Sequence, residues 1–251
     1  MTRSSKGKKT ASATADGMRL NRFIARSGIA SRRNCDTGIK NGMVTVNGRL
    51  VINPAEKISQ GDLVLWDGSS VTLPDMFVAV MNKPSGYETT MNESASRPVS
   101  QLSVGMPRGA APVGRLDIRT GGLLLWSNDG ELVYRLTHPK WKIEREYSLI
   151  LAKPPERDAI EKMRKGVYIA PGEFSKPRSV ERTGAKTLSV VLTTGRNREV
   201  RRLSKFSGIP LIGLERIRFG PVLLEDLERG KWKTLDPEEI ASLCKAVRLN
   251  R

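Results

Sequence analysis

The chain has few of the side chains that hold metals or form common catalytic triads. Its 251 residues include one histidine, His138, and two cysteines, Cys35 and Cys244, which lack the CxxC spacing of a zinc knuckle. Histidine-ligated metal sites and Ser-His-Asp triads are therefore nearly excluded, and a structural disulfide is not expected. Because the chain also lacks a Walker loop and a GxGxxG pattern, we expect neither a metal nor another cofactor.

Long apolar runs are also missing. No segment approaches the ~18 consecutive apolar residues that suggest a transmembrane helix, and the N-terminus MTRSSKGKKTASATADG has no apolar signal region. We therefore expect a cytoplasmic protein without a membrane partner. Residues 1–17 are basic and have no large apolar side chain apart from Met1. This composition predicts a flexible basic tail.

Acidic residues are scarce relative to basic ones. The chain has 43 Lys and Arg against 26 Asp and Glu, which gives a formal net charge of +17. Such an excess favours a polyanionic partner, most often a nucleic acid, through release of counterions from the phosphates. The alternative is a basic protein whose charge only aids solubility.

Two short helices are predicted where the ordered chain begins. Leu20, Phe23 and Ile24 recur at the spacing of an amphipathic helix, and Gly28 is typical of its C-terminal end. Ser31 is a good N-cap for a second helix over about 32–40, which Asn41-Gly42 would end.

A β-hairpin should follow these helices. Val44 and Val46 alternate with Thr45, Asn47-Gly48 is a two-residue turn, and 49–52 and 62–66 are predicted strands. Residues 18–66 carry eight Lys and Arg and three Asp and Glu, a net charge of +5. The two helices hold the candidate RNA-binding residues of this segment: Arg19, Arg22, Arg26, Arg32 and Arg33. The pattern LNRFIARSGIASRR followed by VTVNG resembles the S4-like RNA-binding module, which implies contact with RNA shape and backbone and no catalysis.

A second domain is predicted after a polar linker at 67–75. Residues 76–251 contain an apolar strand in FVAVMNKPSG, a strand over 146–151, helices over 155–165 and 199–207, and a strongly β segment at 188–193. The elements do not repeat as βαβ units. We therefore expect an α+β chain: a small S4-like αα-β module, then a domain with a mixed, largely antiparallel central sheet flanked by helices.

The most informative segment is GRLDIRTGGLLLWSNDG, residues 114–130. It places one carboxylate, Asp117, between Arg115 and Arg119 and then enters an apolar run. Positive neighbours keep a carboxylate ionised and also attract phosphates. On its own such an aspartate would more often be a cap or a salt-bridge partner.

The surrounding motifs strengthen the functional interpretation. NKPSG, GRLDIRTGGLLLWSNDGEL, LTHP, REY and GRNREVRRL occur in this order from about residue 76 onward. Together they resemble the pseudouridine synthases that modify ribosomal RNA, in the RsuA/RluB branch, whose members typically carry an N-terminal S4-like module. The resemblance implies an isomerase that cleaves the N1–C1′ bond of a flipped-out uridine and joins C5 to C1′ without a cofactor.

The resemblance also assigns roles to individual residues. It implies that Asp117 is the catalytic carboxylate, which either attacks C1′ or takes the C2′ proton, and that Arg201 pairs with it. Tyr147 matches the tyrosine that stacks on the target uracil, and its alternative is a buried core tyrosine. Arg115 matches a residue that contacts RNA beside the flipped nucleotide. Lys83 and Arg196 are further candidates for phosphate contacts, and 123–125 should form an apolar floor.

Several alternatives remain open. A large-subunit (23S) target is preferred and a small-subunit (16S) target is the alternative, with free RNA and ribosomal assembly intermediates both possible as the form of the substrate. The hypothesis from another class is a non-catalytic RNA-binding or ribosome-assembly protein. We expect a monomer.

Overall fold

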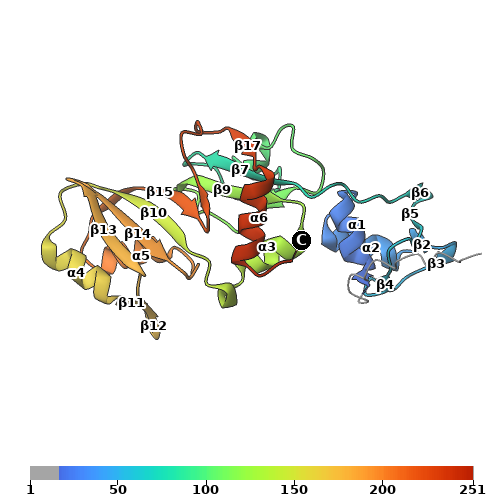
Figure 1. Cartoon of the computed structure of the whole chain (residues 1–251), viewed down its shortest axis with the longest axis horizontal. Helices are drawn as coiled ribbons and strands as arrows, with labels where there is room; N and C mark the ends of the chain where they lie inside the picture. Colours follow the sequence, from blue (N-terminus) through green and yellow to red (C-terminus); the bar gives the residue numbers. More distant parts are fainter. Residues whose placement is uncertain (1–16, 251) are drawn as a thin grey trace, which may run out of the picture. The chain divides into compact units, whose positions relative to one another are not determined.

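The chain divides into two compact units, Met1–Pro74 and Asp75–Arg251, in a computed structural model that describes residues 17–250 (Figure 1). The basic tail expected at 1–17 lies outside the described residues, except for Gly17. No helix within 17–250 is long and apolar enough to cross a lipid bilayer. Both cysteines are buried and free.

The first unit begins with the two predicted helices. Helix α1 spans Leu20–Ser27 and ends at Gly28, whose φ of 80° is the left-handed conformation that favours glycine. Helix α2 spans Arg32–Lys40, and its N-cap Ser31 accepts a hydrogen bond from the Asn34 amide at 3.3 Å. Apolar side chains of both helices pack with those of the neighbouring strands into one core.

Short antiparallel strands complete this unit. They are β1 (Met18–Arg19), β2 (Val44–Val46), β3 (Arg49–Leu50), β4 (Lys57–Ile58), β5 (Val64–Trp66) and β6 (Ser69–Ser70), with sheet orders β1-β4 and β3-β2-β5-β6. The linker expected at 67–75 needs correction, because β6 pairs with β5 and Val71 is buried in the core. The unit extends to Pro74 for that reason.

The second unit contains a mixed, largely antiparallel sheet of nine strands, which confirms the α+β prediction. Its main order is β13-β14-β10-β15-β9-β7-β17, while β16 pairs with β15 and β8 with β9. The strands are β7 (Val78–Lys83), β8 (Ala111–Pro112), β9 (Gly121–Ser127), β10 (Arg145–Leu151), β13 (Ser179–Gly184), β14 (Thr187–Leu192), β15 (Leu211–Phe219), β16 (Val222–Leu223) and β17 (Trp232–Thr234). Strands β11 (Val167–Ala170) and β12 (Glu173–Ser175) form a separate hairpin.

Helices cover this sheet in two groups. Helices α3 (Gly130–Thr137) and α6 (Pro237–Ala246) lie side by side and pack on one face of β7 and β9 (Figure 1). Helices α4 (Arg157–Lys165) and α5 (Glu199–Phe206) pack with β10, β13 and β14. Two short 3-10 helices occupy Val99–Leu102 and Pro139–Trp141. Strand β9 is buried on both faces, which explains its uninterrupted apolar sequence.

The two halves of the large sheet join through one short parallel pairing. Strand β9 meets β15 at only two residue pairs, Gly121 with Glu215 and Gly122 with Arg216. Gly122 has a φ of 93°, and a Cβ there would clash with the Arg216 carbonyl oxygen. Glycine is therefore required at this position for two reasons. It can adopt the positive φ, and its lack of a side chain lets the neighbouring strand approach closely.

Substituting Gly122 tests this junction. We expect Gly122→Ala to lower the free energy of unfolding by at least about 3 kcal/mol, because strain and a backbone clash add together. The control is Gly208→Ala: Gly208 has a φ of 80° but open space around the added methyl, so the loss should be only about 1–2 kcal/mol. Urea unfolding of both variants gives the comparison. Equal losses would show that the close approach of β15 is unimportant.

Candidate active site

Asp117 lies on a tight turn just before β9. The Thr120 amide donates to the Asp117 carbonyl at 2.9 Å, which closes the turn over Ile118 and Arg119. Side-chain and backbone donors hold both sides of this turn. The Thr89 hydroxyl donates to the Leu116 carbonyl at 2.8 Å and accepts from the Leu116 amide at 3.2 Å. The position of the Asp117 Cα is thus set by hydrogen bonds to its neighbours.

Two further segments of the chain hold the same turn. The Gly86 amide donates to the Ile118 carbonyl at 2.6 Å. The Lys83 ammonium donates to the carbonyls of Thr120, at 2.8 Å, and Pro84, at 3.0 Å. The end of β7 and the loop that follows it therefore support the turn that carries Asp117.

The structure corrects the prediction that Lys83 contacts an RNA phosphate. Its side chain is fully buried, so it does not offer its charge to an RNA phosphate as expected. Burial lowers the pKa of the Lys83 ammonium to about 8, while the nearby Asp117 carboxylate opposes that shift and Arg216 adds to it. Through these two hydrogen bonds Lys83 acts on the turn as a positioning residue.

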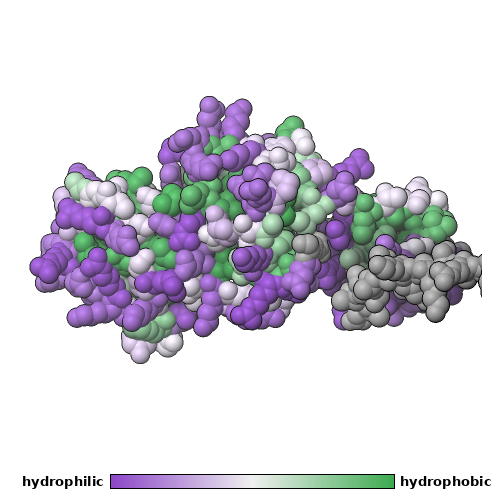
Figure 2. Space-filling model, in the orientation of Figure 1, coloured by the Kyte–Doolittle hydropathy of each residue, from purple (hydrophilic) through white to green (hydrophobic). Residues whose placement is uncertain are grey.

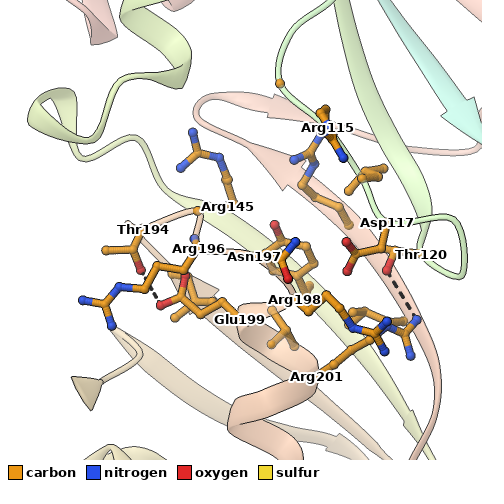
Figure 3. Close-up of a pocket in the computed structure, with 18 of the residues that line it drawn as sticks. Arg115, Asp117, Thr120, Arg145, Thr194, Arg196, Asn197, Arg198, Glu199 and Arg201 are labelled. Atoms are coloured by element: carbon orange, nitrogen blue, oxygen red, sulfur yellow. Dashed lines mark hydrogen bonds between the residues drawn. The ribbon is translucent and has the colours of Figure 1, made fainter. Parts of the chain in front are cut away.

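Arg201 reaches the turn from helix α5. Its Nη2 donates to the Arg119 carbonyl at 2.6 Å and to the Thr120 hydroxyl at 3.3 Å (Figure 3). The ion pairs formed within residues 17–250 do not include one between Arg201 and Asp117, so the predicted bidentate pair is not formed in this structure. The guanidinium bonds the turn's backbone instead. Burial lowers the pKa of Arg201, and the Asp117 carboxylate opposes the shift.

A cavity of about 420 Å³ opens beside Asp117. Its volume lies in the range of small-molecule sites. In Figure 3 the Asp117 carboxylate points toward the open centre, with Arg115 and Arg201 on either side of it. Apolar walls come from Leu116, Leu192, Val200, Leu214 and Phe219. The apolar floor expected from 123–125 is absent, because these residues are buried within β9.

Tyr147 brings an aromatic ring to the same cavity. It is half-buried on β10, opposite Arg216 of β15. Arg216 is fully buried, and its Nε donates to the Leu123 carbonyl at 2.8 Å. Burial lowers the pKa of Arg216, and the Tyr147 hydroxyl opposes this shift. Arg145 and Arg216 both lie over the Phe219 ring, at 4.8 and 4.9 Å from its centre.

The rim of the cavity is a loop before α5 that Glu199 holds in place. The buried Glu199 carboxylate accepts hydrogen bonds from the Ser175 hydroxyl at 2.8 Å, the Thr194 hydroxyl at 2.7 Å and the Arg196 amide at 3.1 Å. Arg198 on this rim has a φ of 48°, a strained angle for a bulky side chain. Such strain is common where a loop is shaped for binding.

The structure brings together some predicted residues and leaves others apart. Asp117, Tyr147, Arg201, Arg115 and Arg196 all line the cavity. Arg115 is exposed, while Arg196 also donates to the Phe174 carbonyl at 2.6 Å. The predicted arginines of the first unit lie in a separate compact unit; Arg19, Arg32 and Arg33 are exposed, and Arg22 and Arg26 are half-buried.

Three supporting residues are not predicted from the sequence. Thr89 lies in a polar segment typical of an exposed loop, yet it is buried against Leu116. Arg216 belongs to LERIRFG, where alternating charge suggests a solvent-facing strand. The sequence places Glu199 only at the start of a helix. These residues contact segments that are far apart in the chain, and such contacts leave no local sequence pattern. Only Glu199 could have been found from the sequence, because it lies in the GRNREVRRL motif. Within 17–250 the side chains form no cluster of three or more His, Cys, Asp or Glu suited to a metal ion.

Comparison with known proteins points to one family. A family model described as RNA pseudouridylate synthase matches residues 77–205, and an S4 domain model matches residues 18–64. The chain is similar to a protein of Aquifex aeolicus (strain VF5) named uncharacterized RNA pseudouridine synthase, with 35% identity over 92% of this chain and 96% of that protein. It is 32% identical to the ribosomal large subunit pseudouridine synthase B of Bacillus subtilis (strain 168), over 90% of this chain and 95% of that protein. A crystal structure of a pseudouridylate synthase superposes with a TM-score of 0.65 and 28% identity, covering 90% of this chain and 99% of that one.

The buried Lys83 gives a prediction for stability. Its pKa falls from 10.5 to about 8 on folding, so between these pH values the unfolded chain holds a proton that the folded chain has released. The free energy of unfolding of the wild type should therefore rise with pH in this window, by up to about 3 kcal/mol. Lys83→Met lacks this titration. Subtracting its free energy of unfolding from that of the wild type at each pH cancels the contributions of the other titrating groups. Urea unfolding from pH 7 to 10.5 measures that difference, and parallel curves would contradict the assignment.

Proposed function

The chain belongs to the RNA pseudouridylate synthase family, and from this premise we propose that it isomerises a uridine of ribosomal RNA, in the 23S molecule, to pseudouridine. The name of the Bacillus subtilis relative assigns that protein to the large ribosomal subunit, which supports the choice of 23S over 16S. The S4 domain in the first unit is consistent with an RNA substrate.

One observation carries the proposal for the catalytic group. The Asp117 carboxylate faces the cavity and accepts no hydrogen bond from the described part of the chain, although its backbone is held at Leu116, Ile118 and Thr120. Lys83 and Arg201 supply positive charge nearby without occupying the carboxylate. A carboxylate on a backbone that is held in place, with its oxygens free of hydrogen bonds, suits either attack at C1′ or removal of the C2′ proton.

In the remaining steps the uracil ring must turn over within the pocket. The N1–C1′ bond breaks, the uracil turns, C5 bonds to C1′, and the C5 proton is lost while N1 gains one, so no atoms are added overall. Tyr147 forms a wall against which the uracil can stack, and its hydroxyl is the candidate for handling the C5 proton. Arg115, which is exposed, is the candidate to fill the gap left in the RNA or to hold a phosphate.

Asp117→Asn tests the catalytic role. We expect at least a roughly thousandfold loss of pseudouridine formation, because the amide is neither a nucleophile nor a base, while RNA affinity stays within a few-fold. Release of tritium from 23S or 16S ribosomal RNA labelled at uridine C5 measures the reaction and separates the two targets. Asp226→Asn, at an exposed aspartate away from the cavity, is the matched control. Wild-type activity in Asp117→Asn would refute the assignment, and a wild type inactive on every ribosomal RNA would favour a non-catalytic binding protein.

The role of the first unit is tested by the salt dependence of binding. Arg32 and Arg33 are exposed on α2. We expect Arg32→Gln/Arg33→Gln to weaken RNA binding and to reduce the slope of log affinity against log salt by about 0.7–0.9 for each phosphate that the variant no longer neutralises. The control is Arg49→Gln, because Arg49 is already paired with Glu56 at 2.5 Å. Filter binding at salt concentrations between roughly 50 and 300 mM gives the slopes, because affinity that depends on phosphate contacts falls steeply over this range. An unchanged slope for the double variant would exclude these arginines from the interface.

A further inference from the structure

The hairpin of β11 and β12 exposes two aromatic rings side by side. Tyr168 is 66% exposed and Phe174 is 43% exposed. They lie opposite each other in the hairpin, with ring centres 5.2 Å apart and planes tilted by 64°. The whole chain has only four tyrosines and five phenylalanines. Two of these nine rings therefore form a pair that is largely open to solvent.

The surroundings of this pair are charged rather than apolar, and they include Glu173 of β12, which pairs with Arg202 at 2.8 Å. Figure 2 shows a small pale and green area where Figure 1 draws the hairpin, with hydrophilic residues around it. Lys165 and Lys176 are exposed and flank the two strands in sequence. A protein-docking surface usually presents a larger continuous apolar patch. Aromatic faces set among cations are instead typical of proteins that bind single-stranded nucleic acid.

The hairpin is fixed to the rim of the active-site cavity. Ser175 of β12 donates to Glu199, the residue that also holds Thr194 and the Arg196 amide on the rim. The Arg196 guanidinium, which lines the cavity, donates to the Phe174 carbonyl at 2.6 Å. The hairpin that carries the aromatic pair is thus joined to the rim through hydrogen bonds of the Ser175 hydroxyl and the Phe174 carbonyl.

We propose that Tyr168 and Phe174 form a stacking platform for unpaired bases of the RNA strand that carries the target uridine. This inference rests on the proposed function, because the strand is the substrate of that reaction. The platform holds bases by their faces, while Arg196 and the neighbouring lysines hold phosphates. Stacking tolerates any base, so the platform adds affinity and orientation rather than sequence choice.

The experiment measures binding and reaction separately. Binding is measured in the Asp117→Asn background with two probes, a single-stranded oligoadenylate and the ribosomal RNA that the wild type modifies. We expect Tyr168→Ala and Phe174→Ala each to weaken both complexes at least about fivefold, as for the loss of one stacked base. The salt slope should not change, since no charge is removed. With Asp117 intact, KM should rise while kcat at saturating RNA stays within twofold.

Matched variants separate stacking from a change of fold. Phe206→Ala removes another aromatic ring of similar exposure, 45%, from the end of α5 outside the hairpin and should leave both affinities unchanged. Tyr168→Phe keeps the ring and should bind like the parent. Tyr168→Trp also keeps a stacking face, and its added fluorescence should be quenched by oligoadenylate. This last variant reports on the platform even where an alanine loosens the hairpin.

The outcomes distinguish this inference from the proposed function. If the wild type modifies ribosomal RNA but the alanine variants bind both probes like the parent, the platform is wrong and the function stands. A loss in Tyr168→Phe equal to that in Tyr168→Ala would point to the hydroxyl and overturn stacking, as would unquenched Tyr168→Trp. If the wild type modifies no ribosomal RNA, the proposed function fails, while the oligoadenylate result still decides whether the rings bind RNA.

Discussion

The site depends on a single constraint: the turn that carries Asp117 is held by its backbone rather than by its carboxylate. Thr89, Gly86, Lys83 and Arg201 each bond a peptide group of 116–120. They come from the loop after β7, from β7 itself and from α5, segments that only the folded sheet brings together. Because the donors bond carbonyls, the carboxylate stays open to the cavity. A carboxylate held by its own oxygens would be equally well placed but less available to react.

The other charged groups of the cavity also hold the structure in place and leave the Asp117 carboxylate open. Glu199, the other carboxylate of the lining, is occupied by three donors and serves the rim. Two of the buried cations bond carbonyl oxygens, Lys83 those of Thr120 and Pro84 and Arg145 those of Leu136 and Ile143. The buried Arg216 bonds the Leu123 carbonyl through Nε, while its Nη2 has no hydrogen-bond partner among the described residues. Carbonyl oxygens stabilise a cation without cancelling its charge. Positive potential therefore remains in the cavity for an anionic group such as a phosphate.

The parts of the fold set by local rules could be predicted from sequence. Ser31 and Gly28 mark helix ends because capping depends on neighbouring residues alone, and the structure confirms α1 and α2 there. The α+β class and the mixed sheet are also confirmed. The linker prediction is wrong because Ser69 and Ser70 look polar in isolation, whereas their backbone pairs with β5. Asp117, Tyr147 and Arg201, which come from the motifs that resemble the family, line one cavity, and their chemical roles stay predictions.

The errors at the site have a common physical origin. A lysine at the end of a strand and an arginine in an alternating strand are usually solvated, so the sequence predicts a surface role for Lys83 and no role for Arg216. Their burial depends on the two-residue parallel contact between β9 and β15, which brings Gly122 against the Arg216 backbone and closes the sheet beneath the Asp117 turn. Desolvating such cations costs free energy. The nine-stranded sheet offsets that cost with apolar burial on both faces of β7 and β9, so the strands that support the charged site are also packed between two apolar clusters.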